Sequence, residues 1–145
     1  FAPSTGVIIE SPGFLPNETG LRNLLLLADM SGKADKAAAR KAMVTLGLGP
    51  DEKKPVGKYS LGQRQRLGFA QAFMENPDVL ILDEPFNAMD KASMEEVHDL
   101  LQQFKRGGKT IILASHSATD IEKACDIVYE MENGNLNMIQ NKTVN

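Results

Sequence analysis

The chain has a single cysteine, no apolar run long enough to span a membrane and no excess of positive charge. Cys125 alone among 145 residues cannot form an internal disulfide or a cysteine-based metal cluster, so a reducing compartment is indicated. No apolar run approaches the ~20 residues of a transmembrane helix, and the start shows no signal-peptide pattern. The 16 basic and 19 acidic residues give a net charge of −3, which argues against bulk nucleic-acid binding.

The length and composition fit one globular domain with a core of its own. The chain is 42% hydrophobic and 24% charged, both ordinary values for a soluble protein. It begins with Phe1 rather than a methionine, in the lead-in to what the pattern indicates is an internal strand. We therefore expect a fragment of a longer polypeptide.

Predicted strands and helices alternate along most of the chain. Strands are expected at residues 5–9, 79–83, 110–114, 127–131 and 136–139, and helices at 19–30, 34–46, 60–75, 91–105 and 117–125. The alternation indicates parallel βαβ units, and Asn133-Gly134 predicts an antiparallel hairpin at one edge of the sheet. Residues 79–83 are continuously apolar, which is typical of a strand buried on both faces. The helices at 19–30 and 34–46 are expected to form an inserted helical layer.

Two adjacent acids, Asp83 and Glu84, follow the apolar run at residues 79–82. They are expected at the carboxyl edge of a parallel sheet, where open α/β folds bind ligands. The competing interpretation is a solvated acid pair at the end of a strand. His116 follows another predicted strand and would reach the same edge, although a histidine there could equally be a plain loop residue.

Residues 60–63, Ser-Leu-Gly-Gln, stand at the start of a predicted helix. Ser60 and Gln63 fit a Ser-x-x-Gln capping box. A serine hydroxyl, the backbone at Gly62 and the helix dipole could together attract a phosphate. A capping box without any ligand is the other interpretation.

Taken together, these segments resemble the nucleotide-binding subunits of ABC transporters over essentially the whole chain. Residues 59–66, Tyr-Ser-Leu-Gly-Gln-Arg-Gln-Arg, are similar to the signature Leu-Ser-Gly-Gly-Gln and its basic continuation. Residues 79–84 resemble the Walker B strand with its catalytic glutamate, and residues 87–90, Asn-Ala-Met-Asp, resemble the D-loop. His116 matches the switch histidine. All four motifs occur in the order that the family shows.

The resemblance implies an α/β fold. It predicts a partial P-loop NTPase core of the RecA-like type with parallel strands, an ABC helical subdomain and a C-terminal β-hairpin. Residues 1–145 would be the C-terminal part of one ABC ATPase domain. Residues 11–76 would form the helical subdomain with the signature, and residues 1–10 and 77–145 would supply core strands and helices.

The same resemblance implies hydrolysis of ATP with Mg²⁺. On the nucleotide bound by the same subunit, Asp83 would hold Mg²⁺, Glu84 would polarise the attacking water, and His116 would contact the γ-phosphate. Glu10 would also act on this nucleotide. The signature residues Ser60, Gly62 and Gln63 would act on the nucleotide bound by a second subunit, which is arranged head to tail with the first. Asp90 of the D-loop would cross the interface between the two subunits.

Two positions depart from the family pattern. Leu61 stands where the signature has its first glycine, so we expect modified rather than abolished phosphate binding. Glu10 stands where most members carry a glutamine that senses the γ-phosphate and contacts the permease. Residues 10–14, Glu-Ser-Pro-Gly-Phe, resemble the corresponding segment of the subgroup that exports, or confers immunity to, lantibiotics and similar peptide antibiotics. In that subgroup a glutamate replaces the glutamine.

The expected partners are a second nucleotide-binding subunit and a transmembrane permease, which would hold the protein at the cytoplasmic face of the membrane without inserting it. No Gly-x-x-x-x-Gly-Lys-Ser/Thr occurs in the chain, so these residues alone are expected to be inactive. The alternatives are an ABC-type ATPase of translation or DNA repair, and a nucleotide-independent interaction module.

Overall fold

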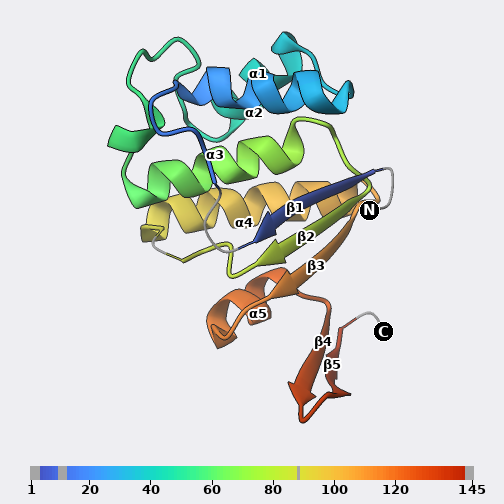
Figure 1. The fold of residues 1–145 in the computed structure, drawn as a ribbon. Helices are drawn as coiled ribbons and strands as arrows, with labels where there is room; N and C mark the ends of the chain where they lie inside the picture. Colours follow the sequence, from blue (N-terminus) through green and yellow to red (C-terminus); the bar gives the residue numbers. More distant parts are fainter. Residues whose placement is uncertain (1–3, 10–12, 88, 143–145) are drawn as a thin grey trace.

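Three parallel strands form the central sheet of the computed structural model, which describes residues 4–9, 13–87 and 89–142. The order is β1 (Thr5–Ile9), β2 (Val79–Asp83) and β3 (Thr110–Ala114). Val7, Ile81 and Ile112 share one row of the register. The predicted bounds of all three strands are confirmed, and their carboxyl ends meet at one edge of the sheet (Figure 1).

A helical layer precedes β2 in the sequence. It consists of α1 (Gly20–Ser31), α2 (Lys36–Thr45), a short 3-10 turn at Val56–Lys58, and α3 (Leu61–Phe73). Thr19, Asp35 and Ser60 cap the three α-helices, each accepting a hydrogen bond from a backbone N–H of the first turn. Such caps satisfy N–H groups that have no partner within the helix. The two helices expected at residues 19–30 and 34–46 are confirmed as α1 and α2.

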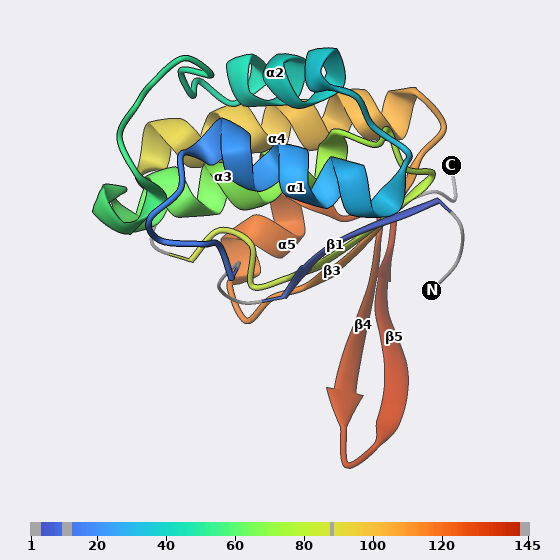
Figure 2. The same ribbon diagram turned by 45° about the horizontal axis from the view of Figure 1, so that its top comes forward.

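After β2 come α4 (Lys91–Arg106), β3 and α5 (Ala118–Ala124), and then the hairpin of β4 (Ile127–Glu132) and β5 (Asn135–Asn141). Asn133 and Gly134 have φ values of 49° and 79°, as the predicted tight hairpin turn requires. The expected position of this hairpin at an edge of the parallel sheet is wrong. The two strands form a sheet of their own, which projects away from the helices in Figure 2.

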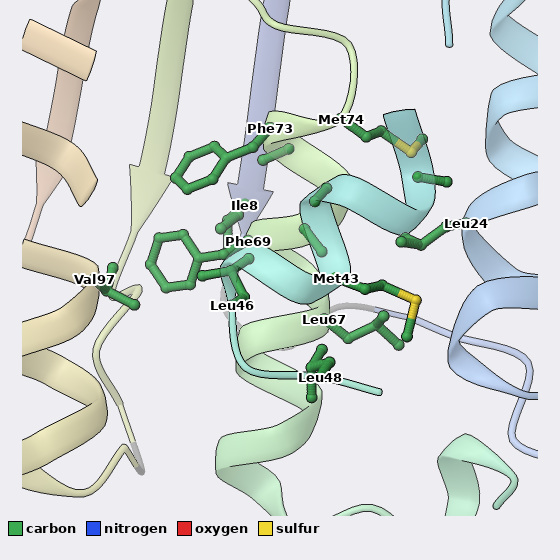
Figure 3. Close-up of a cluster of buried hydrophobic side chains, with 14 of the residues drawn as sticks. Ile8, Leu24, Met43, Leu46, Leu48, Leu67, Phe69, Phe73, Met74 and Val97 are labelled. Carbon is green, nitrogen blue, oxygen red and sulfur yellow. The ribbon is translucent and has the colours of Figure 1, made fainter. Parts of the chain in front are cut away.

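The core lies between the helices and one face of the sheet, with α3 at its centre. Leu67 and Phe69 of α3 have no exposed surface, and Leu24 of α1 and Met43 of α2 pack into the same cluster. Figure 3 shows these side chains together with Ile8 of β1. The apolar positions of α3 thus bind the helical layer to the sheet.

The other face of the sheet is much less covered. Leu80 and Leu82 of β2 are 0% and 1% exposed, whereas Ile112 of β3, whose row lies on the opposite face, is 54% exposed. Val79 and Ile81, which lie on that second face of β2, are only half-buried, so the expectation that β2 is buried on both faces is wrong. The reason is that α3 and α4 lie over the same face of the sheet (Figures 1 and 2).

Among the described residues, none of the helices combines the length and the apolar character that crossing a membrane requires.

Candidate functional site

The acid pair predicted from the sequence lies where β2 ends. Asp83 is the last residue of β2 and is in register with Ala114 of β3. The backbone N–H of Glu84 donates to the Ala114 carbonyl at 2.9 Å, so the pairing of the two strands continues by one residue. Glu84 then adopts a φ of 45°, a left-handed conformation that is uncommon for residues other than glycine. The chain therefore turns sharply at Glu84, the carboxylate that the sequence predicts to polarise water.

His116 contacts the carboxylate of Glu84. Its backbone N–H donates to Glu84 Oε1 at 3.0 Å, and its ring Nδ1 lies 2.7 Å from the same oxygen. An ionised carboxylate only accepts hydrogen bonds, so Nδ1 donates in this pair and Nε2 takes no part in it. The side chain of His116 is 82% exposed and that of Glu84 is 23% exposed. The structure therefore brings Glu84 and His116 together in a contact that is open to a ligand.

The predicted capping box is present at the start of α3. Ser60 Oγ accepts from the backbone N–H of Gln63 at 3.1 Å, and Gln63 Oε1 accepts from the backbone N–H of Ser60 at 3.0 Å. Lys54 Nζ donates to the same Gln63 oxygen at 3.1 Å. The hydroxyl of Ser60 keeps a proton that it can donate, and Ser60 is exposed. This helix start combines a positive dipole end with a nearby ammonium group.

Leu61 is the first residue of α3, and 54% of it is exposed. Gly62 follows it and is half-buried. The leucine side chain therefore adds apolar surface beside the capping box, at the position where the sequence departs from the signature.

Asp90 is the N-cap of α4. Its Oδ1 accepts from the backbone N–H of Ser93 at 3.0 Å, and its Oδ2 accepts from the Ser93 hydroxyl at 2.7 Å. The backbone hydrogen bond from Ser93, followed by that from its hydroxyl, lowers the pKa of the Asp90 carboxyl. Both oxygens thus have a local partner in the capping turn.

Gln65 is a buried polar residue within the signature-like segment 59–66, and the sequence motifs gave it no role of its own. Only 3% of it is exposed, and its Nε2 donates to the carbonyl oxygen of Pro85 at 2.8 Å. This bond joins α3 to the turn that follows Glu84. The sequence did contain a signal, because a glutamine four residues before Phe69 falls on the apolar face of the helix, where an amide needs a buried partner.

The structure brings most of the predicted site residues to one end of the molecule. The start of α3 and the carboxyl end of β2 lie at the same end in Figure 1, and the bond from Gln65 to Pro85 links them directly. Glu84 and His116 are in contact, and Asp83 immediately precedes Glu84. Glu10, the expected counterpart of the family glutamine, lies outside the described residues.

Comparisons with known proteins match this arrangement. A sequence model described as ABC transporter matches residues 2–87. The bacitracin transport ATP-binding protein BcrA of Enterococcus faecalis is 41% identical over 132 residues, which is 90% of this chain and 43% of BcrA. The ABC transporter ATP-binding protein YybJ of Bacillus subtilis, described as uncharacterized, is 42% identical over 94% of this chain and 62% of its own length.

A third relative is the lantibiotic transport ATP-binding protein SrtF of Streptococcus pyogenes, which is 34% identical over 85% of this chain and 53% of its own length. The chain thus spans about half the length of these curated relatives. A solved structure described as a dimeric, post-hydrolysis state of an ATP-binding cassette with ADP and Pi has a TM-score of 0.81 at 19% identity, over 94% of this chain and 63% of that chain. The structural likeness shows that the fold is that of an ATP-binding cassette.

Proposed function

Because the chain belongs to the ABC transporter family, we propose that the whole protein binds and hydrolyses ATP and that this hydrolysis drives transport by a membrane permease. The contact between Glu84 and His116 at the carboxyl end of β2 carries the proposal. It places a carboxylate and an imidazole side by side at the sheet edge where α/β folds bind ligands. In this assignment residues 11–76 are the helical subdomain, and residues 1–10 and 77–145 belong to the core.

Glu84 is assigned as the residue that polarises the attacking water. Its Oε1 is held by the backbone N–H and the ring of His116, so the carboxylate is oriented before any ligand arrives. A fixed carboxylate is the feature that general-base catalysis requires. His116, which is largely exposed, is assigned to contact the γ-phosphate with the outward side of its ring.

Asp83 is assigned to Mg²⁺. The ion prefers oxygen ligands and usually binds through one or two carboxylates together with phosphate oxygens, and two carboxylates follow each other at the end of β2. The donor chemistry of Asp83 and Glu84 therefore fits the ion. When bound, Mg²⁺ would neutralise charge on the phosphates of ATP.

The start of α3 is assigned to the nucleotide of a second subunit. This helix start offers the hydroxyl of Ser60, the backbone N–H groups of its first turn at Gly62 and Gln63, and the positive end of the helix dipole. These groups suit a phosphate. Asp90 would lie at the interface of the two subunits. The solved cassette of similar fold is described as a dimer bound to ADP and Pi, which supports this pairing.

The proposed cargo is a peptide antibiotic. BcrA and SrtF are named for bacitracin and lantibiotic transport, and the glutamate at position 10 agrees with that subgroup. The protein would then work at the cytoplasmic face of the membrane, held there by its permease.

The test is the substitution Glu84→Gln in the whole protein, with Glu96→Gln on the exposed side of α4 as the matched control. Glu84→Gln keeps the size of the side chain but removes the carboxylate that polarises water. We expect ATP binding to persist while phosphate release falls by about 100-fold or more, and Glu96→Gln to behave as the unaltered protein. Unchanged phosphate release by Glu84→Gln would refute the assigned role.

A further inference from the structure

We propose that Gln65 is a positioning residue for the reaction, holding the turn in which Glu84 stands. This inference rests on the proposed ATPase function and adds to it a residue outside the assigned site. The side-chain amide of Gln65 donates to the Pro85 carbonyl at 2.8 Å, and this bond is buried. It joins the second turn of α3 to the residue that immediately follows Glu84.

The turn after β2 needs such support because of its backbone conformation. Glu84 has a φ of 45°, and a glutamate gains nothing from its own side chain in that region, unlike asparagine or aspartate. Uncommon conformations of this kind persist only where the surroundings hold them. The turn is held from the strand side by the Glu84 N–H bond to Ala114 and from the helix side by the Gln65 amide.

Packing reinforces the contact between the turn and the helices. Phe86 is 5% exposed. Its ring centroid lies 6.3 Å from that of Phe69 on α3 and 4.4 Å from that of His98 on α4. The apolar contact sets how closely the turn approaches α3, while the directional hydrogen bond from Gln65 sets the orientation of the Pro85 peptide group. The Pro85 carbonyl belongs to the peptide group that joins Pro85 to Phe86, so the hydrogen bond fixes ψ of Pro85 and φ of Phe86 and holds the residue that directly follows Glu84 in one orientation.

Gln65 also connects the two halves of the proposed mechanism. It belongs to the same helix as Ser60 and Gln63, which are assigned to the nucleotide of the second subunit. A shift of the start of α3 would therefore displace the Pro85 peptide group, because one short, buried hydrogen bond connects the two. The competing view is that Gln65 merely fills the core with a satisfied amide, in which case its loss would weaken folding without touching the reaction.

The test compares Gln65→Met with Gln102→Met in the whole protein. Methionine has nearly the volume of glutamine but cannot donate. Gln102 makes the same type of bond, from Nε2 to the Lys123 carbonyl at 3.1 Å, but this bond is exposed and joins α4 to α5. We expect Gln65→Met to lower kcat by about tenfold or more, with KM for ATP within about twofold, because it misplaces the reacting group without changing nucleotide contacts. Gln102→Met should leave both constants unchanged.

A double-mutant cycle separates positioning from general weakening. If Gln65 acts through Glu84, adding Gln65→Met to Glu84→Gln should lower the residual turnover no further. Should Gln65→Met not fold, Gln65→Asn keeps the amide but shortens its reach by one methylene and gives the same comparison. An unfolding midpoint measured for each variant ensures that rates are compared per folded molecule.

Two results would overturn the inference. One is an unchanged kcat in folded Gln65→Met; the other is a full additional loss when Gln65→Met is combined with Glu84→Gln. Either result leaves the proposed function standing as long as Glu84→Gln alone abolishes turnover. Failure of the proposed function would show itself separately, as normal turnover in the Glu84→Gln single variant.

Discussion

The two ends of the parallel sheet are built from similar parts that are combined differently. At the amino end, Lys109 Nζ donates to Asp78 Oδ1 at 3.0 Å and to the Asn76 carbonyl at 3.2 Å. At the carboxyl end, the ring of His116 lies 2.7 Å from Glu84 Oε1. Each end also carries a left-handed residue, with φ values of 48° at Asn76 and 45° at Glu84.

The partners and the backbone explain why only the carboxyl end suits the catalysis that we propose. An ammonium group only donates hydrogen bonds, whereas an imidazole can donate and accept, so the pair at the amino end acts as a tie between β2 and β3. Asparagine adopts a left-handed backbone more readily than glutamate does. The backbone strain therefore lies at the carboxyl end, where Gln65 and His116 hold Glu84 and its turn in place. Backbone strain of this kind is common at functional sites.

The largest expected difference between the ends is in turnover. His116→Ala removes the ring that contacts Glu84 and is assigned to the γ-phosphate, while the backbone N–H bond to Glu84 remains. We expect ATP turnover of the whole protein to fall by about 100-fold, as when a single stabilising donor is lost. Lys109→Ala, at the opposite end, should leave turnover per folded molecule unchanged. Equal losses in the two variants, measured by phosphate release, would remove the distinction between the ends.

A smaller difference is expected in stability. Phe86, beside the strained turn, is buried, so Phe86→Ala should lower the free energy of unfolding by about 3–5 kcal/mol. Phe104, near the amino end, stacks on Phe73 with a centroid distance of 4.6 Å but is only half-buried. Phe104→Ala should therefore cost less. Denaturant unfolding of both variants measures this, and a larger cost for Phe104→Ala would contradict the packing described for the turn.

The smallest effect is in the pH dependence of stability. Hydrogen bonds from Lys109 and then Ser4 lower the pKa of Asp78 below its ordinary value of 3.8. A lowered pKa in the folded state contributes stability above the unfolded pKa, and this is lost as the pH falls through the folded value. Asp78→Asn should thus be less stable than the unaltered chain at neutral pH, and the gap should narrow in acid below 3.8. A gap that stays constant would mean that the ion pair contributes nothing.

Much of this arrangement could be predicted because its determinants are local. The apolar run at 79–82 followed by two acids determines where β2 ends, and the serine and glutamine at 60 and 63 determine how α3 begins. The proximity of His116 to Glu84 follows from adjacent parallel strands, whose carboxyl ends share an edge.

The remaining features depend on packing between distant segments. The partner of Gln65 is a carbonyl 20 residues further along the chain, and the contact requires α3 to lie at a particular height over β2. The separate hairpin of β4 and β5 and the exposure of Ile112 on one face of the sheet likewise depend on which segments pack together. Neither follows from the alternation of apolar residues within a strand.

The most direct measurement of the central claim, that the Glu84 carboxylate activates the water that attacks ATP, is the identity of the nucleotide bound to Glu84→Gln. The whole protein carrying this substitution would be incubated with ATP and Mg²⁺, isolated, and analysed for its bound nucleotide. We expect intact ATP to remain in the variant while the unaltered protein contains ADP. ADP forming at the same rate in both proteins would contradict the claim.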